Sequence, residues 1–423
     1  MWEKRIPVKE AKSLRGPVEI AGWAHEVRSI GKLKFIILRD STGKVQVMLK
    51  QGIVPDELLS LHINKEDFLY VKGQVVDSKF AQDGVEVIPH SIEILGKVGK
   101  KLPVDPAGVV ESDFDTRLNY RYIDLRRKEV SDVFRIKSIV SNAFRSFAVQ
   151  NGFVEIHTPS LVGAATEGGA DLFEVEYFER KAYLAQSPQL YKEMAVLGGL
   201  EKVFMQVPVF RAEKHNTVTH LNEIIQMDVE MALVDCIGAM DWLEKFFLHI
   251  CKEAVSSPVG EEYSLAAPKK VMRLTYSEIV DRLNSEGASI EWGRDFTKEE
   301  EKKIAEIVGR DAFFIYEWPT EVRAFYSMPK DDRVCNAFDL IYKGLEISSG
   351  AQRIHVPELL EAQLSKRGLN PQDFSFFIDA FYYGAPPHSG WSIGLERLVM
   401  KLMNLPNIRD AMLFPRDRMR LHP

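Results

Sequence analysis

The segment FRAEKHNTVTHLNE, residues 210–223, is the most informative part of the chain, because strand-like runs lie on both sides of it. VFMQVPV comes before it and IIQMDVEMAL comes after it, and both runs are rich in residues that favour strands. A strand, a polar loop and a second strand place Arg211 at the surface of a sheet. Its guanidinium there offers a fixed, planar set of donors to a phosphate or a carboxylate. An ion pair with Glu213 on a solvated hairpin is the alternative interpretation of the same residues.

Further strand-like runs are spread over the same part of the chain. They are AYLAQS, AFFIYEWP, CNAFDLIYKGLEISSG and FSFFIDAFYYG, and FVEIHTP is a strand that ends at Pro159. Most of the spacings between these runs are too short for regular βαβ crossovers, which predicts a mostly antiparallel sheet with helices on its faces. The predicted fold class of this part is therefore α+β.

One long amphipathic helix precedes these strands. Apolar residues from Val133 to Phe147 recur with a spacing of about 3.6 residues. Ser131 is the predicted N-cap of this helix and Gly152 its terminator. Further helices are predicted over residues 236–255, 275–310, 357–368 and 390–404.

The N-terminal part of the chain reads as a small β domain. Five strand-like runs lie between Pro17 and Leu95, and the turn sequence DSTG at 40–43 joins the second and third runs as a hairpin. Five short strands favour a closed barrel of the oligonucleotide-binding (OB) type, although half of a β-sandwich has a similar pattern. Glycine, proline and lysine are frequent just after these strands, as in a linker. We expect an OB domain at 1–98, a linker at 99–130 and a catalytic domain at 131–423.

Composition limits the possible functions of the 423 residues. Hydrophobic residues make up 45% and charged residues 27%, which excludes collagen-like and wholly disordered chains. The 55 basic and 61 acidic residues give a net charge of −6, so any nucleic-acid contact must come from a local patch. Cys236, Cys251 and Cys335 show no CxxC spacing, which disfavours zinc knuckles and disulfides and fits a reducing compartment. No run approaches ~18 apolar residues. We expect a soluble, cytoplasmic protein.

The segment GLEISSGAQR at 344–353 could hold a metal ion. In a strand, Glu346 and Ser348 alternate onto one face, where a carboxylate beside serine oxygens can hold Mg²⁺ on a nucleotide. An edge strand with an outward glutamate is the alternative. His215, His220 and Glu223 do not have the spacing of a helical HExxH zinc site.

The segment GWSIGLERL at 390–398 combines glycines, which permit a close approach of the backbone, with a helix start and an arginine. It also matches the G-x-S-x-G nucleophile elbow of serine hydrolases, with Ser392 as the nucleophile. Asp410 or Asp417 followed by His422 has the right order for a triad. The chain ends too soon after Ser392 for the remaining strands of that fold, so we disfavour a hydrolase.

Together these segments resemble the motifs of class II aminoacyl-tRNA synthetases. FRAE is similar to motif 2, GLER at 394–397 to motif 3, and the long helix up to Pro159 to the dimer-forming motif 1. The OB-type barrel adds the domain order of the aspartyl, asparaginyl and lysyl subgroup, so the resemblance covers essentially the whole chain. QSPQLYK at 186–192 is similar to the aspartate-pocket signature of archaeal-type aspartyl-tRNA synthetases, and EGG at 167–169 resembles their mobile loop.

The resemblance implies the activity and the partners. The enzyme would join L-aspartate to tRNA(Asp) in two steps through aspartyl-adenylate, using ATP and Mg²⁺, as a homodimer that binds no membrane. It leaves open whether tRNA(Asn) is charged as well. The residue types support aspartate on their own, because Lys192 and Arg353 would place two cations on a side-chain carboxylate and an amide competitor would leave those charges unpaired. A solvated helix residue is the alternative for Lys192.

The resemblance also implies a role for each matching residue. Arg211, Glu346 and Arg397 would be the catalytic residues, with Arg211 bridging the substrate carboxylate and the α-phosphate. A general base is not needed, because the attacking carboxylate is already anionic at pH 7. Aspartate would contact Glu167, Gln189, Lys192, Arg211, Asp228, Ser349 and Arg353. ATP would contact Arg211, Ala212, Glu213, Thr219, His220, Leu221, Glu346, Gly394, Leu395, Glu396 and Arg397, and Mg²⁺ would contact Glu346 and Ser349.

In the barrel, Phe35 lies on a strand between Lys34 and an apolar run. An aromatic ring flanked by donors can stack on an unpaired base, and a place in the barrel core is the alternative. The resemblance implies that Phe35 stacks on an anticodon base and that Gln46 and Glu93 read the neighbouring bases. Arg28, on another strand, is the fourth predicted anticodon residue.

Two positions depart from the family pattern. Close relatives have Arg-His-Leu where this chain has Thr219-His220-Leu221, which removes one expected phosphate donor, and Ser392 replaces a usual glycine. Three other functions are possible from the sequence: asparaginyl-tRNA synthesis, a catalytically silent paralogue that only binds RNA, and a tRNA-independent amide-forming ligase. The ligase would not need the N-terminal barrel.

Overall fold

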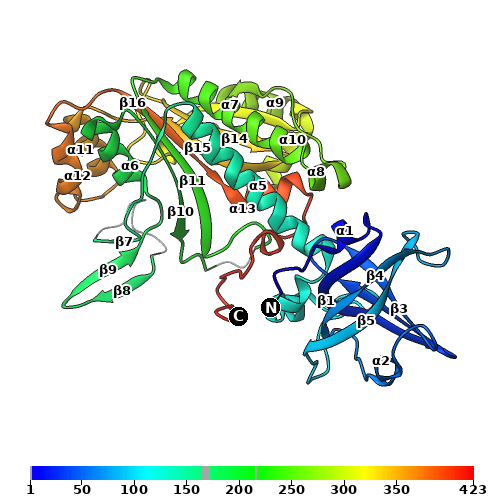
Figure 1. The fold of residues 1–423 in the computed structure, drawn as a ribbon. Helices are drawn as coiled ribbons and strands as arrows, with labels where there is room; N and C mark the ends of the chain where they lie inside the picture. Colours follow the sequence, from blue (N-terminus) through cyan, green and yellow to red (C-terminus); the bar gives the residue numbers. More distant parts are fainter. Residues whose placement is uncertain (1, 164–171, 215–216) are drawn as a thin grey trace. The chain divides into compact units, whose positions relative to one another are not determined.

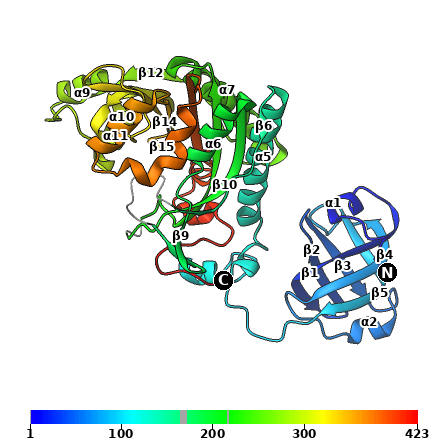
Figure 2. The same ribbon diagram turned by 90° about the vertical axis from the view of Figure 1, so that its left-hand side faces the viewer.

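The computed structural model describes residues 2–163, 172–214 and 217–423. The chain divides into two compact units, Met1–Lys128 and Glu129–Pro423 (Figures 1 and 2). Each unit has a hydrophobic core of its own.

The N-terminal unit is a closed barrel with the strand order β1-β2-β3-β5-β4. β3 and β5 pair in parallel, and the other neighbouring strands pair antiparallel. This closure confirms the predicted OB-type barrel and excludes half of a sandwich. The strands are β1 (Gly16–Ile30), β2 (Leu33–Arg39), β3 (Lys44–Lys50), β4 (Phe68–Asp77) and β5 (Val85–Gly96), and the short helices are α1 (Val8–Ala11) and α2 (Asp56–Ser60).

Alternation along the barrel strands decides which side chains enter its core. On β2, Ile36 and Leu38 are fully buried, whereas Phe35 between β1 and β3 is half-buried and belongs to the opposite face. Asp40 closes the β2–β3 hairpin, because its Oδ1 accepts hydrogen bonds from the backbone N–H groups of Thr42 at 2.7 Å and Gly43 at 3.1 Å. The predicted hairpin is thereby confirmed.

Two short helices, α3 (Phe114–Asn119) and α4 (Arg121–Asp124), lie within the predicted linker. The long helix α5 (Lys128–Gln150) begins three residues before the predicted N-cap Ser131, so that prediction was wrong. Buried Val130 continues the apolar stripe of α5 towards its N-terminus, which explains the earlier start. The predicted end is confirmed, since Gly152 has a φ of +76° directly after the helix.

The C-terminal unit is built on an eight-stranded sheet with the order β12-β13-β14-β15-β16-β11-β10-β6. Two pairs, β6–β10 and β12–β13, are parallel, and the others are antiparallel, as predicted. A small sheet has the order β7-β9-β8. The strands are β6 (Val154–Glu155), β7 (Leu161–Val162), β8 (Glu174–Tyr177), β9 (Arg180–Leu184), β10 (Lys202–Phe210), β11 (Glu223–Ala232), β12 (Met272–Thr275), β13 (Ala312–Pro319), β14 (Val334–Tyr342), β15 (Leu345–Gln352) and β16 (His388–Gly394).

Helices cover the large sheet in groups. α5 and α7 (Cys236–Val255) pack on its central strands and share one core with them, in which Phe144 and Phe246 lie against Trp391 of β16. A second cluster joins α6 (Gln189–Ala195), α11 (Pro357–Lys366) and α12 (Ser375–Phe381), which lie together in Figure 1. The other helical segments are η1 (Val196–Leu200), α8 (Pro258–Glu262), α9 (Tyr276–Ser285), α10 (Lys298–Val308), η2 (Thr320–Val322), η3 (Pro371–Phe374), α13 (Leu395–Leu402) and η4 (Ile408–Ala411).

Three predicted boundaries differ from the structure. The helix predicted over 275–310 is two helices, α9 and α10, because Gly287 and Gly293 between them have φ values of +85° and +107°. The helix predicted over 390–404 begins only at Leu395, since the residues before it pair as β16. FSFFIDAFYYG is helical rather than a strand: Asn370 caps the preceding turn, and Phe374, Phe377, Ile378 and Phe381 have helical spacing in the core.

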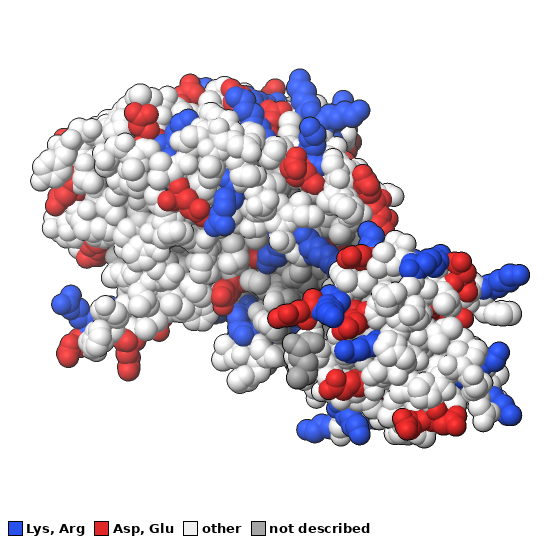
Figure 3. Space-filling model, viewed as in Figure 1, with Lys and Arg blue, Asp and Glu red and all other residues white. Residues whose placement is uncertain are grey.

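The surface carries both charges. On the face shown in Figure 3, basic and acidic side chains are interspersed on each unit without a field of one sign. Among the described residues, every helix is too short or too polar to cross a bilayer.

Candidate active site

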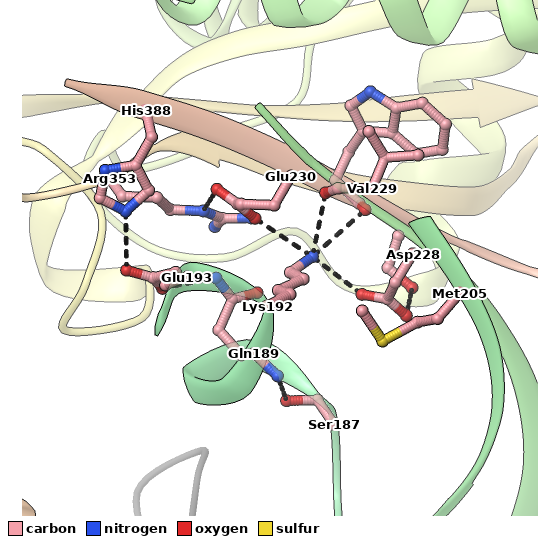
Figure 4. A network of polar contacts seen from close by, with 12 residues as sticks. Ser187, Gln189, Lys192, Glu193, Met205, Asp228, Val229, Glu230, Arg353 and His388 are labelled. Atoms are coloured by element: carbon pink, nitrogen blue, oxygen red, sulfur yellow. Dashed lines mark hydrogen bonds and ion pairs between the residues drawn. The ribbon is translucent and has the colours of Figure 1, made fainter. Parts of the chain in front are cut away.

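Lys192 is the centre of a buried network of charged side chains (Figure 4). Its Nζ lies 2.8 Å from Asp228 Oδ1 and 3.4 Å from Glu230 Oε2. It also donates to the backbone oxygens of Val229 and Trp391, each at 3.3 Å. An ammonium group out of contact with water needs such partners. The alternative of a solvated lysine on the surface of α6 is therefore wrong.

Arg353, the residue directly after β15, contacts Glu230 as well. Its Nε and Nη2 donate to the two oxygens of Glu230 at 3.0 and 3.2 Å, and Arg353 is only 3% exposed. Burial alone would raise the pKa of Glu230, but the charges of Arg353 and Lys192 outweigh it and lower that pKa. Lys192 and Arg353, far apart in sequence, thus meet at one buried anion.

Gly390 on β16 makes room for that anion. A Cβ at this position would lie 2.0 Å from Glu230 Oε2 and 2.3 Å from the backbone oxygen of Val229. No other residue type fits without moving the network. Glu230 was not predicted as a site residue, although Asp228 and Glu230 alternate onto one face of β11 in the DVE run.

Asp228 links this pocket to a neighbouring cavity. Its Oδ1 accepts from Lys192, and its Oδ2 accepts a hydrogen bond from Ser392 Oγ at 3.1 Å. Ser392 lines the cavity, which has a volume of about 630 Å³ including its open mouth. Ser392, which stands where close relatives usually have glycine, therefore contacts Asp228 through its hydroxyl.

The cavity brings together all three sequence segments that carried the prediction. Arg211 is half-buried there, and none of the described residues accepts a hydrogen bond from its guanidinium. The ion pair with Glu213 is not formed among the described residues, which removes the solvated-hairpin alternative. The cavity is lined by Arg211, Glu213, Thr219, His220, Leu221, Ile224, Gln226, Glu346, Ile347, Ser348, Ser349, Ser392, Gly394, Glu396, Arg397 and Ile408.

Asn222 holds the two ends of the 211–222 loop together. Its Nδ2 donates to the backbone oxygens of Arg211 at 2.7 Å and Glu213 at 3.2 Å, and the Arg211 N–H donates to the Asn222 backbone oxygen at 2.9 Å. These bonds fix the backbone that carries Arg211. Sequence reasoning missed Asn222, because its side chain acts on the backbone of its own loop and has no partner spacing to detect.

Arg397 lies at the start of α13, where β16 ends. Its Nη1 donates to the backbone oxygen of Glu346 at 3.0 Å, and its Nη2 lies 3.2 Å from His220 Nε2. Arg397 thus joins β15, the loop and α13 at one side of the cavity.

Of the residues predicted to contact ATP, two do not line the cavity, and the carboxylate of a third already accepts hydrogen bonds from other residues. The Leu395 side chain is in the hydrophobic core, on the side of α13 that packs against the sheet. Ala212 lines a separate hollow with C-terminal residues such as Arg416 and Leu421. Glu396 borders the cavity, but its carboxylate accepts from Lys137 Nζ at 2.7 Å and from the backbone N–H of Ile225 at 3.0 Å. It holds α13 to α5 and β11.

A β-bulge in β15 alters the prediction that Glu346 and Ser348 share one face of a strand. Leu340 pairs with Ser348 but Ile341 pairs with Glu346, so Ile347 is an extra residue in β15. The simple alternation that put Glu346 with Ser348 is broken. Ser348 is 2% exposed, whereas Ser349 is exposed to solvent.

Asp339 of β14 lies opposite Ser349 and was not identified from the sequence. Burial and the charge of Glu346 raise the pKa of Asp339 to about 7, although the charge of Arg323 opposes this shift. Its Oδ2 pairs with Arg323, and its Oδ1 is buried without a hydrogen-bond partner. Two neighbouring carboxylates beside a serine hydroxyl form a donor set that suits Mg²⁺.

The four predicted anticodon residues lie on four strands of the barrel. Phe35 is half-buried outside the core and pairs across the strands with Arg28 and Met48, so the core alternative is wrong. Gln46 Nε2 donates to Glu86 Oε2 at 2.8 Å. Arg28 and Glu93 are exposed. Glu167, predicted at the aspartate site, lies outside the described residues.

Two family models match the chain. The model of the OB-fold nucleic acid binding domain covers residues 18–95, and the model of class II tRNA synthetases (D, K and N) covers residues 113–418.

Individual relatives match over nearly the whole length. The aspartate--tRNA(Asp/Asn) ligase of Methanopyrus kandleri is 47% identical over 96% of both chains. The aspartate--tRNA(Asp) ligase of Pyrococcus abyssi is 44% identical over 96% of both chains. The crystal structure of Pyrococcus horikoshii asparaginyl-tRNA synthetase with asparaginyl-adenylate superimposes with a TM-score of 0.92 over 100% of both chains at 32% identity. The chain belongs to the class II tRNA synthetases of the D, K and N group.

Proposed function

We propose that the protein is an aspartate--tRNA ligase, which forms aspartyl-adenylate and pyrophosphate from L-aspartate and ATP and then transfers the aspartyl group to the terminal adenosine of tRNA(Asp). The observation that supports this most directly is the meeting of Lys192 and Arg353 beside the nucleotide cavity. The named aspartate ligases at 44–47% identity also support it.

The pocket favours a carboxylate over an amide. Glu230 accepts from Nε and from one N–H of Nη2 of Arg353, so the N–H groups of Nη1, which have no acceptor among the described residues, remain for a ligand. With Lys192 beside them, these donors suit the side-chain carboxylate of aspartate. Asparagine would place an amide N–H₂ against cations that cannot accept a hydrogen bond, which costs an unpaired donor. Asp228 can accept from the α-ammonium group of the substrate.

The chemistry needs orientation and charge stabilisation rather than proton transfer. The attacking carboxylate is anionic at pH 7. Arg211, whose guanidinium has no acceptor among the described residues, would neutralise charge that grows on the α-phosphate. A preorganised donor of this kind contributes about 3 kcal/mol to catalysis. Arg397 at the other side of the cavity suits the γ-phosphate.

Glu346, Ser349 and Asp339 would hold Mg²⁺. The orphaned Oδ1 of Asp339 and the repulsion between Asp339 and Glu346 fit a bound cation. When bound there, Mg²⁺ would neutralise part of the charge of the triphosphate.

Two features suit contacts with macromolecules, namely tRNA and a second copy of the chain. Phe35, outside the barrel core, is suited to stack on an anticodon base. A homodimer through α5 and β6 is supported by exposed Val149 and Val154 at the end of α5 and on the edge strand β6. A second copy would cover this apolar edge.

The test is ATP–pyrophosphate exchange with each amino acid, followed by aminoacylation of purified tRNA(Asp) and tRNA(Asn). We expect exchange with aspartate and charging of tRNA(Asp); the reaction with tRNA(Asn) decides whether the specificity is dual. Exchange with asparagine alone would instead establish an asparaginyl enzyme. A silent RNA-binding paralogue is disfavoured, because Arg211, Glu346 and Arg397 all line one cavity.

A further inference from the structure

Glu193 follows Lys192 on α6 and is fully buried. One oxygen, Oε1, accepts from Gln189 Nε2 at 2.6 Å, and the other, Oε2, lies 3.1 Å from His388 Nε2. Figure 4 shows this chain of contacts beside Lys192 and Arg353. Neither Glu193 nor His388 carries a role in the function proposed above.

The surroundings of His388 determine its protonation. Nδ1 lies 2.9 Å from the backbone oxygen of Pro386, so both ring nitrogens face acceptors. A neutral imidazole has one N–H and can donate to only one of them, whereas an imidazolium donates to both. The ring is fully buried, so bulk water cannot provide the missing bond.

Charged groups from each neighbouring element act on this ring. Burial by itself lowers the pKa of His388, but the hydrogen bond to Glu193 of α6, the charge of Glu193 and the charge of Glu230 of β11 raise it overall. On the segment after β15, Arg353 is paired with Glu230, and the pKa of His355 is lowered by its burial and by His388. The α12 side presents the apolar ring of Phe381, with ring centroids 6.0 Å apart.

Glu193 in turn fixes the orientation of the Gln189 amide. An ionised carboxylate only accepts hydrogen bonds, so the Gln189 atom that faces it must be the nitrogen. The amide oxygen is therefore turned away from Glu193 and stays available as an acceptor. If Glu193 were free to rotate, the amide could flip and present a donor instead.

We propose that Glu193 and His388 are positioning residues, an imidazolium–carboxylate pair that locks the Gln189 amide so that its oxygen accepts a hydrogen bond from the α-ammonium of aspartate. This inference rests on the proposed aspartate activation at the same site. It also completes the charge balance of the buried network: Lys192, Arg353 and His388 are matched by Asp228, Glu230 and Glu193.

A specific pH dependence follows. Once the pH exceeds the raised pKa of His388, the ring loses one donor and the lock on Glu193 weakens. The KM for aspartate then rises by about tenfold, the effect of losing a hydrogen bond to a charged group, while the KM for ATP stays constant. A role confined to fold stability would not separate these two constants.

The experiment measures ATP–pyrophosphate exchange from pH 6 to pH 9 for the wild type, Glu193→Gln, Glu193→Ala and His388→Gln. In Glu193→Gln the new amide can accept from Gln189 and donate to neutral His388, so we expect a KM for aspartate near the wild-type value at pH 6 without the alkaline rise. In Glu193→Ala the KM should be about tenfold higher at all pH values with kcat retained, and His388→Gln should also lose the alkaline rise. His90→Gln, an exposed histidine in the barrel, is the control and should keep the wild-type profile.

A second measurement does not depend on activity. In protein with ¹⁵N-labelled histidine, the His388 ring is assigned by its loss in His388→Gln and titrated by NMR. We expect an imidazolium that persists well above the usual histidine pKa of ~6.5, and a lowered pKa in Glu193→Gln.

Titration of His388 at or below the usual value would overturn the proposal, as would an unchanged KM for aspartate in Glu193→Ala. Failure of the wild type to support aspartate-dependent exchange would instead reject the proposed function, and the NMR titration would still decide whether the pair exists.

Discussion

Replacing Lys192 by methionine should strongly reduce aspartate activation while leaving tRNA binding intact. The change removes an ammonium 2.8 Å from Asp228 and 3.4 Å from Glu230 and leaves the Asp228 carboxylate buried without its cation. Breaking a buried ion pair in this way costs about 3–5 kcal/mol. At about 2–4 °C per kcal/mol, the Tm should fall by roughly 6–20 °C.

The loss of exchange activity in Lys192→Met should be larger than the loss of folded protein at the assay temperature. The substrate carboxylate loses one of two cations, so we expect kcat/KM for aspartate in pyrophosphate exchange to fall at least about 100-fold, or ~2.7 kcal/mol. The double variant Lys192→Met/Asp228→Asn removes both charges and should recover part of the Tm without recovering exchange. Lys343→Met, which removes a lysine bonded to the Lys401 backbone oxygen and to Asn404, is a control for the loss of a lysine.

The measured affinity for tRNA distinguishes a role of Lys192 in the aspartate pocket from a purely structural role. If tRNA binding and aspartate activation fell in parallel in Lys192→Met, or if the double variant regained exchange with its Tm, Lys192 would be a structural residue and the pocket assignment would be wrong.

Three further changes test other parts of the site. Phe35→Ala should lower tRNA(Asp) charging by about tenfold and leave exchange unchanged, whereas Phe80→Ala, 93% exposed in the same barrel, should change neither; loss of exchange would show that Phe35 supports the fold. Thr219→Arg should lower the KM for ATP several-fold by restoring a phosphate donor in the cavity, and an unchanged KM would show that this donor is dispensable. The folded-state pKa of Asp339 is raised to about 7, so its contribution to stability is present below its unfolded pKa of about 4 and is lost as the pH rises to 7. Mg²⁺ should therefore raise the Tm more at pH 8 than at pH 5.5, and Asp339→Asn should remove that difference.

The sequence predicted most of the fold because local patterns specify it. The barrel strands alternate, the helix that became α5 has a clear apolar stripe, and the turns carry glycine and aspartate. Predictions failed where packing overrides local pattern. FSFFIDAFYYG is apolar enough for a strand, but Pro371 and the spacing from Phe374 to Phe381 form helices against α11.

The sequence predicted most of the residues that line the cavity, but it did not reveal some of the buried residues behind them. Arg211 and Arg397 lie in motifs that can be recognised along the chain. Glu193, Glu230 and His388 act by contacts between α6, β11 and β16, which spacing in the sequence does not reveal. The Ile347 bulge is similar, since an extra residue in one strand is visible only beside its partner strand.

Gly390 limits how the amino-acid specificity of this enzyme can be redesigned. A Cβ at this position would overlap Glu230, so the back wall of the pocket is main chain rather than a replaceable side chain. A library that varies this position would mostly yield misassembled pockets. Engineering towards a new amino acid has to work from the opposite wall, on α6, where every change must keep an equal number of positive and negative groups.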